Sequence, residues 1–111
     1  MPTYLIDHIR VPNDRPNEEL RTYLANVKAA TVPFGGKSLA SGPPDRQVEG
    51  VWPGWVVLVQ FPDRASAEAW YSSAEYQKIL PLRLNNAICD TIFIDSTPEG
   101  RTMSDVVEQG H

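Results

Sequence analysis

The fold is decided by residues 49–63, EGVWPGWVVLVQFPD, which join a turn rich in Gly, Pro and Trp to a predicted strand and the start of a helix. The strand is apolar on both faces, with Trp55, Val57, Val59 and Phe61 on one and Val56 and Leu58 on the other. Such a strand must be covered on both sides. At ~25 cal/mol per Å² of apolar area, leaving one face in water would forfeit several kcal/mol. In a chain of 111 residues, we expect the second cover to come from another subunit.

Strands and helices alternate on both sides of this stretch. Residues 4–11 read as a first strand, residues 37–41 as a second, residues 55–61 as the third and residues 90–96 as a fourth. Apolar residues at helical spacing predict an amphipathic helix after a cap at Asn17; they are Leu20, Tyr23, Leu24 and Val27. A second helix begins after Asp63 and restarts at the capping box of residues 72–75. Pro81 is expected to break or kink that second piece, or to open a further one.

This order of elements, strand-helix-strand-strand-helix-strand, is the ferredoxin-like plan of an α+β protein. Its helices cover one face of an antiparallel sheet, so the sequence predicts a homodimer that pairs the sheets of two subunits. Residues 1–96 form the predicted domain. Residues 97–111 read as a polar tail, in which Met103, Val106 and Val107 are able to dock on a partner.

Composition excludes several classes of protein. The net charge of −4 and the scattered Lys and Arg residues leave no basic footprint for nucleic acid. No apolar run approaches the ~20 residues of a membrane span. The segment Met1–Tyr4 lacks the pattern of a signal peptide, and the single cysteine, Cys89, forms no internal disulfide, so we expect a cytoplasmic protein. Cys89 reads as an inert buried thiol rather than as a nucleophile.

Motifs for common cofactors are also missing. The sequence has no Gly-x-Gly-x-x-Gly, no phosphate-binding loop, no His-x-x-x-His, no Cys-x-x-Cys and no Gly-x-Ser-x-Gly. We therefore expect neither a metal nor a nucleotide cofactor.

Candidates for chemistry each have a structural alternative. His8 lies on the first predicted strand and is either a proton shuttle or a simply hydrogen-bonded side chain. Its neighbour Asp7 points to the opposite face of the strand, so the two do not serve one dyad. Glu49, beside Trp52, is either an acid or base with a raised pKa or a carboxylate that fixes the turn. Arg83 either holds an anionic ligand or pairs with Glu49.

Aromatic residues supply the candidate walls of a pocket. The substrate-binding candidates are Trp52, Trp70, Tyr76 and Tyr23, with Tyr71 beside them. Trp70 also suits the core, whereas Tyr76 is placed to offer its hydroxyl to a ligand. The sequence predicts that Glu49, Arg83, Trp52 and Tyr76 line one cavity.

Several short motifs in this order resemble those of the DUF1330 family of the dimeric α+β barrel superfamily. They are Gly35-Gly36, Glu49-Gly50 followed by Trp52, Phe61-Pro62, Ala69-Trp70-Tyr71, Ser73-Ala74-Glu75-Tyr76-Gln77 and Arg83. The resemblance spans roughly residues 4–95. It implies a ferredoxin-like subunit that pairs its sheet with a twin and holds a small cavity between sheet and helices. The wider superfamily includes cofactor-independent monooxygenases, small lyases and isomerases, and ligand-sensing domains.

Two kinds of function follow from these observations. The first is a cofactor-independent enzyme that moves a proton on a small organic substrate. Glu49 or His8 would be its acid or base, with Arg83 and Tyr76 as positioning groups. The second is a non-catalytic ligand-binding or accessory protein of a metabolic pathway. Both would use the same pocket.

Overall fold

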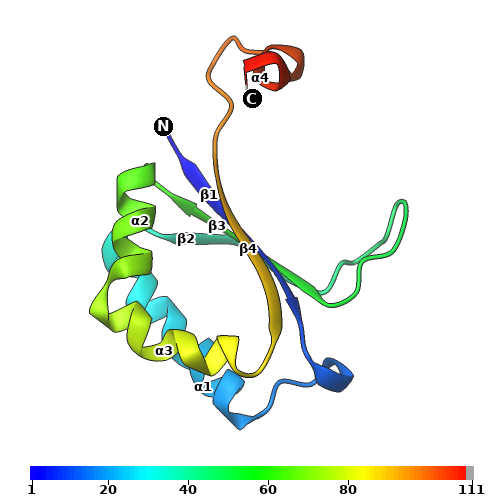
Figure 1. Cartoon of the computed structure of the whole chain (residues 1–111), viewed down its shortest axis with the longest axis vertical. Coiled ribbons are helices and arrows are strands. Elements are labelled where there is room, and N and C mark those ends of the chain that lie inside the picture. The colour runs from blue at the N-terminus through cyan, green and yellow to red at the C-terminus, as the bar shows by residue number, and fades with distance from the viewer. Residues whose placement is uncertain (110–111) are drawn as a thin grey trace.

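A computed structural model of the protein describes residues 1–109. Its four strands are β1 (Thr3–Arg10), β2 (Lys37–Gly42), β3 (Trp55–Phe61) and β4 (Ile88–Asp95). They form one antiparallel sheet in the order β2-β3-β1-β4 (Figure 1). This is the predicted ferredoxin-like topology. The first strand begins and ends one residue earlier than predicted, and β4 begins two residues earlier, at Ile88.

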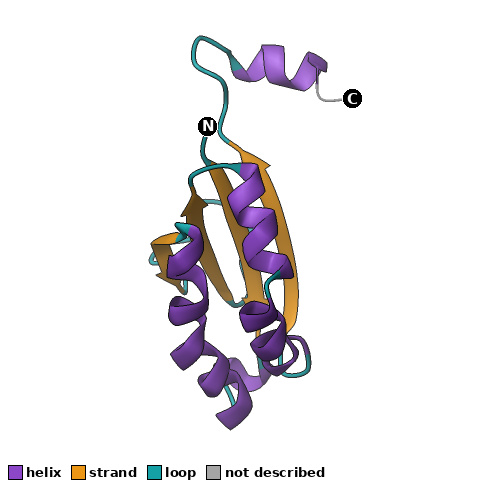
Figure 2. Ribbon diagram, turned by 90° about the vertical axis from the view of Figure 1, so that its left-hand side faces the viewer, coloured by secondary structure: helices purple, strands orange, loops and turns teal. Residues whose placement is uncertain are grey.

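Three helices cover one face of the sheet: α1 (Glu18–Thr31), α2 (Arg64–Ser72) and α3 (Ala74–Leu84) (Figure 2). Each begins at a side chain that accepts a hydrogen bond from a backbone N–H of its first turn, which would otherwise be unpaired. Asn17 accepts from the N–H of Leu20, Asp63 from that of Ser66, and Ser73 from that of Tyr76. The starts predicted after Asn17 and after Asp63 are therefore confirmed. The predicted capping box of residues 72–75 is displaced by one residue, because Ser72 ends α2 and Ser73 is the cap of α3.

Pro81 lies inside α3, which runs unbroken from residue 74 to residue 84. The prediction that it breaks this helix or opens a new one is wrong. Proline cannot donate to the carbonyl one turn earlier, but α3 continues for only three residues beyond it. Leu80 and Arg83, on either side of Pro81, are buried against the sheet, and this packing favours the last turn.

The two faces of the sheet differ because side chains alternate along each strand. Leu5 and Phe61 lie under the helices and pack with Trp70, Tyr76 and other aromatic or aliphatic residues in the core. Side chains on the other face have no helix above them, and we call it the open face. Its apolar members are Tyr4, Ile6, Val56, Leu58, Ile88, Ile92 and Ile94.

Two segments lie outside this compact body. Residues 43–54, between β2 and β3, form a long hairpin loop that extends beyond the sheet (Figure 1). The segment predicted as a tail contains a fourth helix, α4 (Met103–Gln109), which stands beyond the end of β4 (Figures 1 and 2). Met103 and Val107 are exposed there, while the side chain of Val106 and residues 110–111 lie outside the described part of the chain. Within residues 1–109, no helix combines the length and hydropathy that crossing a membrane requires.

Candidate functional site

A cavity of about 550 Å³ lies between α1 and the β2–β3 side of the sheet. Its size is within the range of small-molecule sites. Most of its wall is apolar, formed by Leu5, Ile9, Val27, Val57, Val59 and Trp70. The cavity is therefore a space that the helices leave unfilled on the covered face of the sheet.

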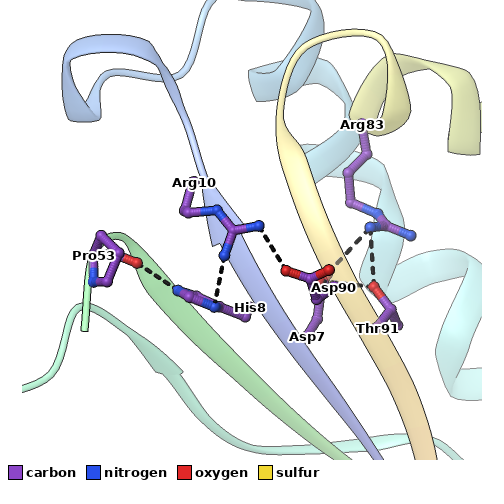
Figure 3. Close-up of polar contacts among 7 residues, drawn as sticks. All are labelled: Asp7, His8, Arg10, Pro53, Arg83, Asp90 and Thr91. Carbon is purple, nitrogen blue, oxygen red and sulfur yellow. Dashed lines mark hydrogen bonds and ion pairs between the residues drawn. The ribbon is translucent and has the colours of Figure 1, made fainter. Parts of the chain in front are cut away.

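Charged and polar side chains meet at the buried end of this cavity, which we call the floor. Asp7 on β1 and Arg83 on α3 are 4% and 2% exposed, and they form an ion pair with 3.4 Å between Arg83 Nη1 and Asp7 Oδ2. Thr91 on β4 donates its hydroxyl to Asp7 Oδ1 at 2.8 Å and lies 3.4 Å from Arg83 Nη1 (Figure 3). Arg83 Nε has no hydrogen-bond acceptor among residues 1–109. The guanidinium therefore keeps an unused N–H in a buried position.

Two tyrosines complete the floor. The hydroxyl groups of Tyr23 on α1 and Tyr76 on α3 lie 2.8 Å apart, and Arg83 Nη2 donates to Tyr76 Oη at 3.3 Å. Trp70 packs on the Tyr76 ring with 4.0 Å between ring centroids and donates its indole N–H to Thr31. These contacts fix the two phenol groups beside the ion pair.

Burial dominates the electrostatics of the floor. It raises the pKa of Asp7, although Arg83 and the hydrogen bond from Thr91 act in the opposite direction. Burial also raises the pKa of Tyr23 and of Tyr76, an effect that Arg83 partly offsets at Tyr76. For Arg83, burial opposes the charge, but Tyr76, Tyr23 and Asp7 together raise its pKa. The floor thus combines a carboxylate that accepts protons more readily than usual with a persistent cation.

The mouth of the cavity lies between α1 and the edge strand β2. Lys28 on α1 and the serines Ser38 and Ser41 on β2 line it and are exposed. The register opposite Gln60 turns the side chain of Lys37 to the other face of the sheet. Gly36 lies close to Thr31 and Phe61 at one end, and a side chain at this position would clash with both. Glycine here lets the chain turn into β2 beside the cavity without filling it.

A second polar cluster lies on the open face. His8 Nε2 donates to the carbonyl of Pro53, and Arg10 Nη1 donates to His8 Nδ1 at 2.9 Å (Figure 3). Because a carbonyl only accepts and a guanidinium only donates, these contacts define a neutral imidazole with its proton on Nε2. Arg10 also pairs with Asp90 at 2.6 Å, and the Trp52 ring packs on His8. The cluster thereby fastens the end of the hairpin loop, at Trp52 and Pro53, to the sheet.

The structure brings together four of the predicted site residues: Arg83, Tyr76, Trp70 and Tyr23 all line the cavity. The predicted cavity shared by Glu49, Arg83, Trp52 and Tyr76 is wrong. Trp52 lies with His8 on the open face, and Glu49 is exposed in the hairpin loop. Arg83 pairs with Asp7 rather than with Glu49. Asp7 and His8 do point to opposite faces of β1, as predicted.

Sequence reasoning missed Asp7 as the partner of Arg83, and it missed Thr91 and Lys28. One signal for Asp7 was available in the sequence. Alternate residues of β1 point inward, and Asp7 is the one charged residue among them, between Leu5 and Ile9. A carboxylate at such a position needs a buried partner. The half-buried Cys89, also on β4, has a pKa raised by burial, which agrees with an inert thiol.

A second, more open hollow of about 690 Å³ lies near the start of β4. Its polar lining consists of Arg10, Asn13, Arg15, Asn17, Asn85 and Asn86. None of these side chains is buried. Within residues 1–109, no three His, Cys, Asp or Glu side chains gather in an arrangement suited to a metal ion.

Solved structures share this fold at low sequence identity. The RPA0582 protein of unknown function from Rhodopseudomonas palustris is 16% identical with a TM-score of 0.68, over 86% of this chain and 82% of that one. A dimeric ferredoxin-like protein of unknown function from Jannaschia sp. CCS1 is 12% identical with a TM-score of 0.68, over 86% and 100% of the two chains. SnoaB, a cofactor-independent oxygenase from Streptomyces nogalater, is 8% identical with a TM-score of 0.63, over 92% and 96%. These likenesses establish the fold alone.

The sequence comparisons identify the family. No protein of curated function matches the chain. Residues 2–97, which include every strand, the three helices over the sheet and the whole cavity lining, match the family described as domain of unknown function DUF1330. The chain is therefore a member of the DUF1330 family and has a ferredoxin-like fold.

Proposed function

We propose that the protein binds a small organic molecule in the cavity between α1 and the sheet and transfers a proton on it without a cofactor. One observation carries this proposal: a buried Asp7–Arg83 ion pair lies at the floor of an otherwise largely apolar cavity. Dehydrating an ion pair costs several kcal/mol per ion, and apolar residues of similar volume often serve stability equally well. Handling of a ligand explains the retained charges better than stability does.

The floor has the groups that proton transfer next to a carbonyl requires. Asp7, whose pKa is raised by burial, is the general base that takes a proton from carbon. The negative charge then develops on the carbonyl oxygen. Arg83 and the Tyr76 hydroxyl are the donors that stabilise this oxygen. Glu49 and His8 have no part in this proposal, because neither lines the cavity.

A non-catalytic binding protein is the second candidate, and the geometry around Asp7 favours it. Oδ1 already accepts from Thr91 and Oδ2 already faces Arg83. A carboxylate engaged at both oxygens must give up one contact before it acts as a base. In this case the floor would recognise the polar end of a ligand and leave it unchanged.

Hydrogen exchange in deuterium oxide separates the two candidates. The probe is 2-tetralone, an apolar bicyclic ketone with acidic C–H bonds next to its carbonyl, and NMR follows the replacement of these hydrogens by deuterium. Proton transfer predicts exchange above the buffer rate that is lost in Asp7→Asn. The matched control, Asp90→Asn, removes a carboxylate from the open face and should retain the exchange.

Three outcomes are distinguishable in this experiment. Binding with exchange that depends on Asp7 supports the enzyme. Binding seen as a raised melting temperature, with exchange at the buffer rate, supports the binding protein. Exchange at the buffer rate without any rise in the melting temperature contradicts both.

We also propose that the protein is a homodimer assembled through the open face. Three isoleucines of β4 on this face, Ile88, Ile92 and Ile94, are 66%, 53% and 49% exposed. Together with Ile6, Val56 and Leu58 they make the kind of contiguous apolar patch that usually marks an interface. The likeness to proteins described as dimeric and ferredoxin-like supports the same arrangement.

A further inference from the structure

The charges at the floor of the cavity cancel. Arg83 Nη1 and Asp7 Oδ2 are 3.4 Å apart, and both side chains are buried. Lys28 lies at the mouth, where it is exposed and remains solvated. The buried part of the cavity therefore presents a charged pair but no net charge to a ligand.

The floor also contains hydrogen-bond donors without acceptors. The hydroxyl groups of Tyr23 and Tyr76 bring two protons, and the 2.8 Å contact between their oxygens uses one of them. The hydrogen bonds within residues 1–109 give the other proton no acceptor, and Arg83 Nε–H has none either. The thiol of Cys89 lies near the guanidinium, but sulfur is a weak acceptor. A buried donor without an acceptor costs free energy, which an oxygen atom of a ligand would recover.

Resting on the proposed small-molecule function, we propose that Asp7 selects the charge of the ligand. By neutralising Arg83, it restricts the cavity to uncharged molecules that carry an acceptor oxygen. The ligand class is a ketone, or a similar carbonyl compound, with an apolar body. Its oxygen accepts from the free donors of the floor, and its body lies against Leu5, Val57 and Val59. Unlike proton transfer, this role requires no free oxygen on Asp7.

A charged ligand meets two opposing effects at this floor. The oxygens of a carboxylate would gain from Arg83, but they would lie close to the carboxylate of Asp7. Burying a second negative charge there has a large cost in dehydration and repulsion. A neutral carbonyl oxygen accepts the same hydrogen bonds without this cost. Removing the charge of Asp7 should therefore change the preference from the ketone to the carboxylate.

Three probes with the same bicyclic body test the selection. They are 2-tetralone, tetralin-2-carboxylate and tetralin, which has no polar group. Calorimetry at neutral pH measures the dissociation constant of each. Wild-type protein should bind 2-tetralone about tenfold more tightly than tetralin, as one or two net hydrogen bonds allow. It should bind the carboxylate about tenfold or more weakly than 2-tetralone, because the buried charge has no free counterion.

The variant Asp7→Asn tests the part that this residue has in the selection. It keeps the size of the side chain and leaves Arg83 without compensation, so it should bind tetralin-2-carboxylate more tightly than 2-tetralone. The matched control, Asp90→Asn, removes an exposed carboxylate from the open face and should keep the wild-type order. Thermal unfolding gives a second measurement where a variant is too unstable for calorimetry, since the tighter ligand raises the melting temperature more.

The results separate this inference from the proposal beneath it. If the wild type binds the carboxylate as tightly as 2-tetralone, or if Asp7→Asn keeps the wild-type order, the selection by Asp7 is wrong and the binding cavity stands. If the predicted orders are found without hydrogen exchange on 2-tetralone, the selection is supported and proton transfer is wrong. If none of the probes binds up to its solubility limit, the cavity proposal fails and the inference fails with it.

Discussion

The two faces of the sheet are made by the same strands but have different surfaces. On the covered face, β1 contributes Leu5, Asp7 and Ile9, all of them buried, and the helices leave a cavity over part of them. On the open face, the same strand contributes Ile6 and His8, which no helix covers. The covered face is thus a closed surface with buried charges, whereas the open face is an apolar surface with its polar contacts around His8.

This difference indicates a division of roles. A cavity with a polar floor suits a ligand, because a small molecule satisfies donors and fills space that side chains leave. A broad apolar patch suits another protein surface. Because side chains alternate between the two faces of β1, this one strand contributes both to the binding site and, on its other side, to the assembly surface.

The largest expected effect is on assembly. Leu58→Asp puts a charge in the middle of the open face, and burying this charge without a partner should lower the dimer affinity by about a thousandfold or more. Sedimentation at micromolar concentration should then find monomers. Leu84→Asp makes the same change at an exposed leucine of α3 and should leave the dimer intact. A wild-type protein that sediments as a monomer would contradict the proposed role of the open face.

The next effect is on stability, at the floor of the cavity. Arg83→Met should lower the free energy of unfolding by about 3 kcal/mol, because it leaves Asp7 buried without its cation. Denaturant unfolding measures this loss. Adding Asp7→Asn in the same chain should recover part of it, since the uncompensated carboxylate is gone. Fully additive losses in the double variant would mean that the two side chains do not interact.

A smaller effect is a pH dependence that belongs to Asp7. Its pKa is raised on folding, so the folded state binds more protons than the unfolded state between the ordinary value of 3.8 and the raised one. Asp7 therefore makes its full contribution to the free energy of unfolding below pH 3.8. As the pH rises through the raised pKa of the folded state, this contribution falls by no more than ~1.4 kcal/mol per pH unit.

Unfolding at a series of pH values, in wild type and in Asp7→Asn, measures this dependence. The stability difference, wild type minus variant, should fall as the pH rises through that window and then level off. A difference that rises with pH would show a carboxyl whose pKa is lowered on folding, contrary to the burial argument.

The smallest expected effect is at Glu49. This residue is exposed in the hairpin loop and outside the cavity lining. Glu49→Gln should therefore change the free energy of unfolding by less than about 0.5 kcal/mol and leave probe binding unchanged. If Glu49→Gln lost probe binding and kept its fold, Glu49 would take part in the binding site, contrary to this account.

Local patterns were enough to predict the fold. The two-faced strand, the caps at Asn17 and Asp63 and the alternation around Ile92 and Ile94 each act within a few residues. Pro81 was misjudged because its helical position depends on the packing of residues around it.

The site was predictable only in part. Tyr23 was placed on an apolar helix face by its spacing with Leu20 and Val27, whereas Trp70, Tyr76 and Arg83 were candidates by residue type, and the four do meet. The partner of Arg83 lies 76 positions away on β1, and sequence alone does not choose between two carboxylates for one guanidinium. Trp52 was misplaced because the path of a long loop depends on its contacts with His8, not on its own composition.

The central claim is that the covered face binds the ligand and the open face does not, and tryptophan indole signals test it directly. Trp70 lines the cavity, whereas Trp52 lies over His8 on the open face. The chain has three tryptophans, so Trp52→Phe and Trp55→Phe assign two indole signals and leave the third to Trp70. A nitrogen–proton NMR titration with 2-tetralone then follows Trp52 and Trp70 in one sample. The account predicts that the Trp70 signal shifts in proportion to occupancy while the Trp52 signal stays in place. A shift of Trp52 with an unmoved Trp70 would contradict it.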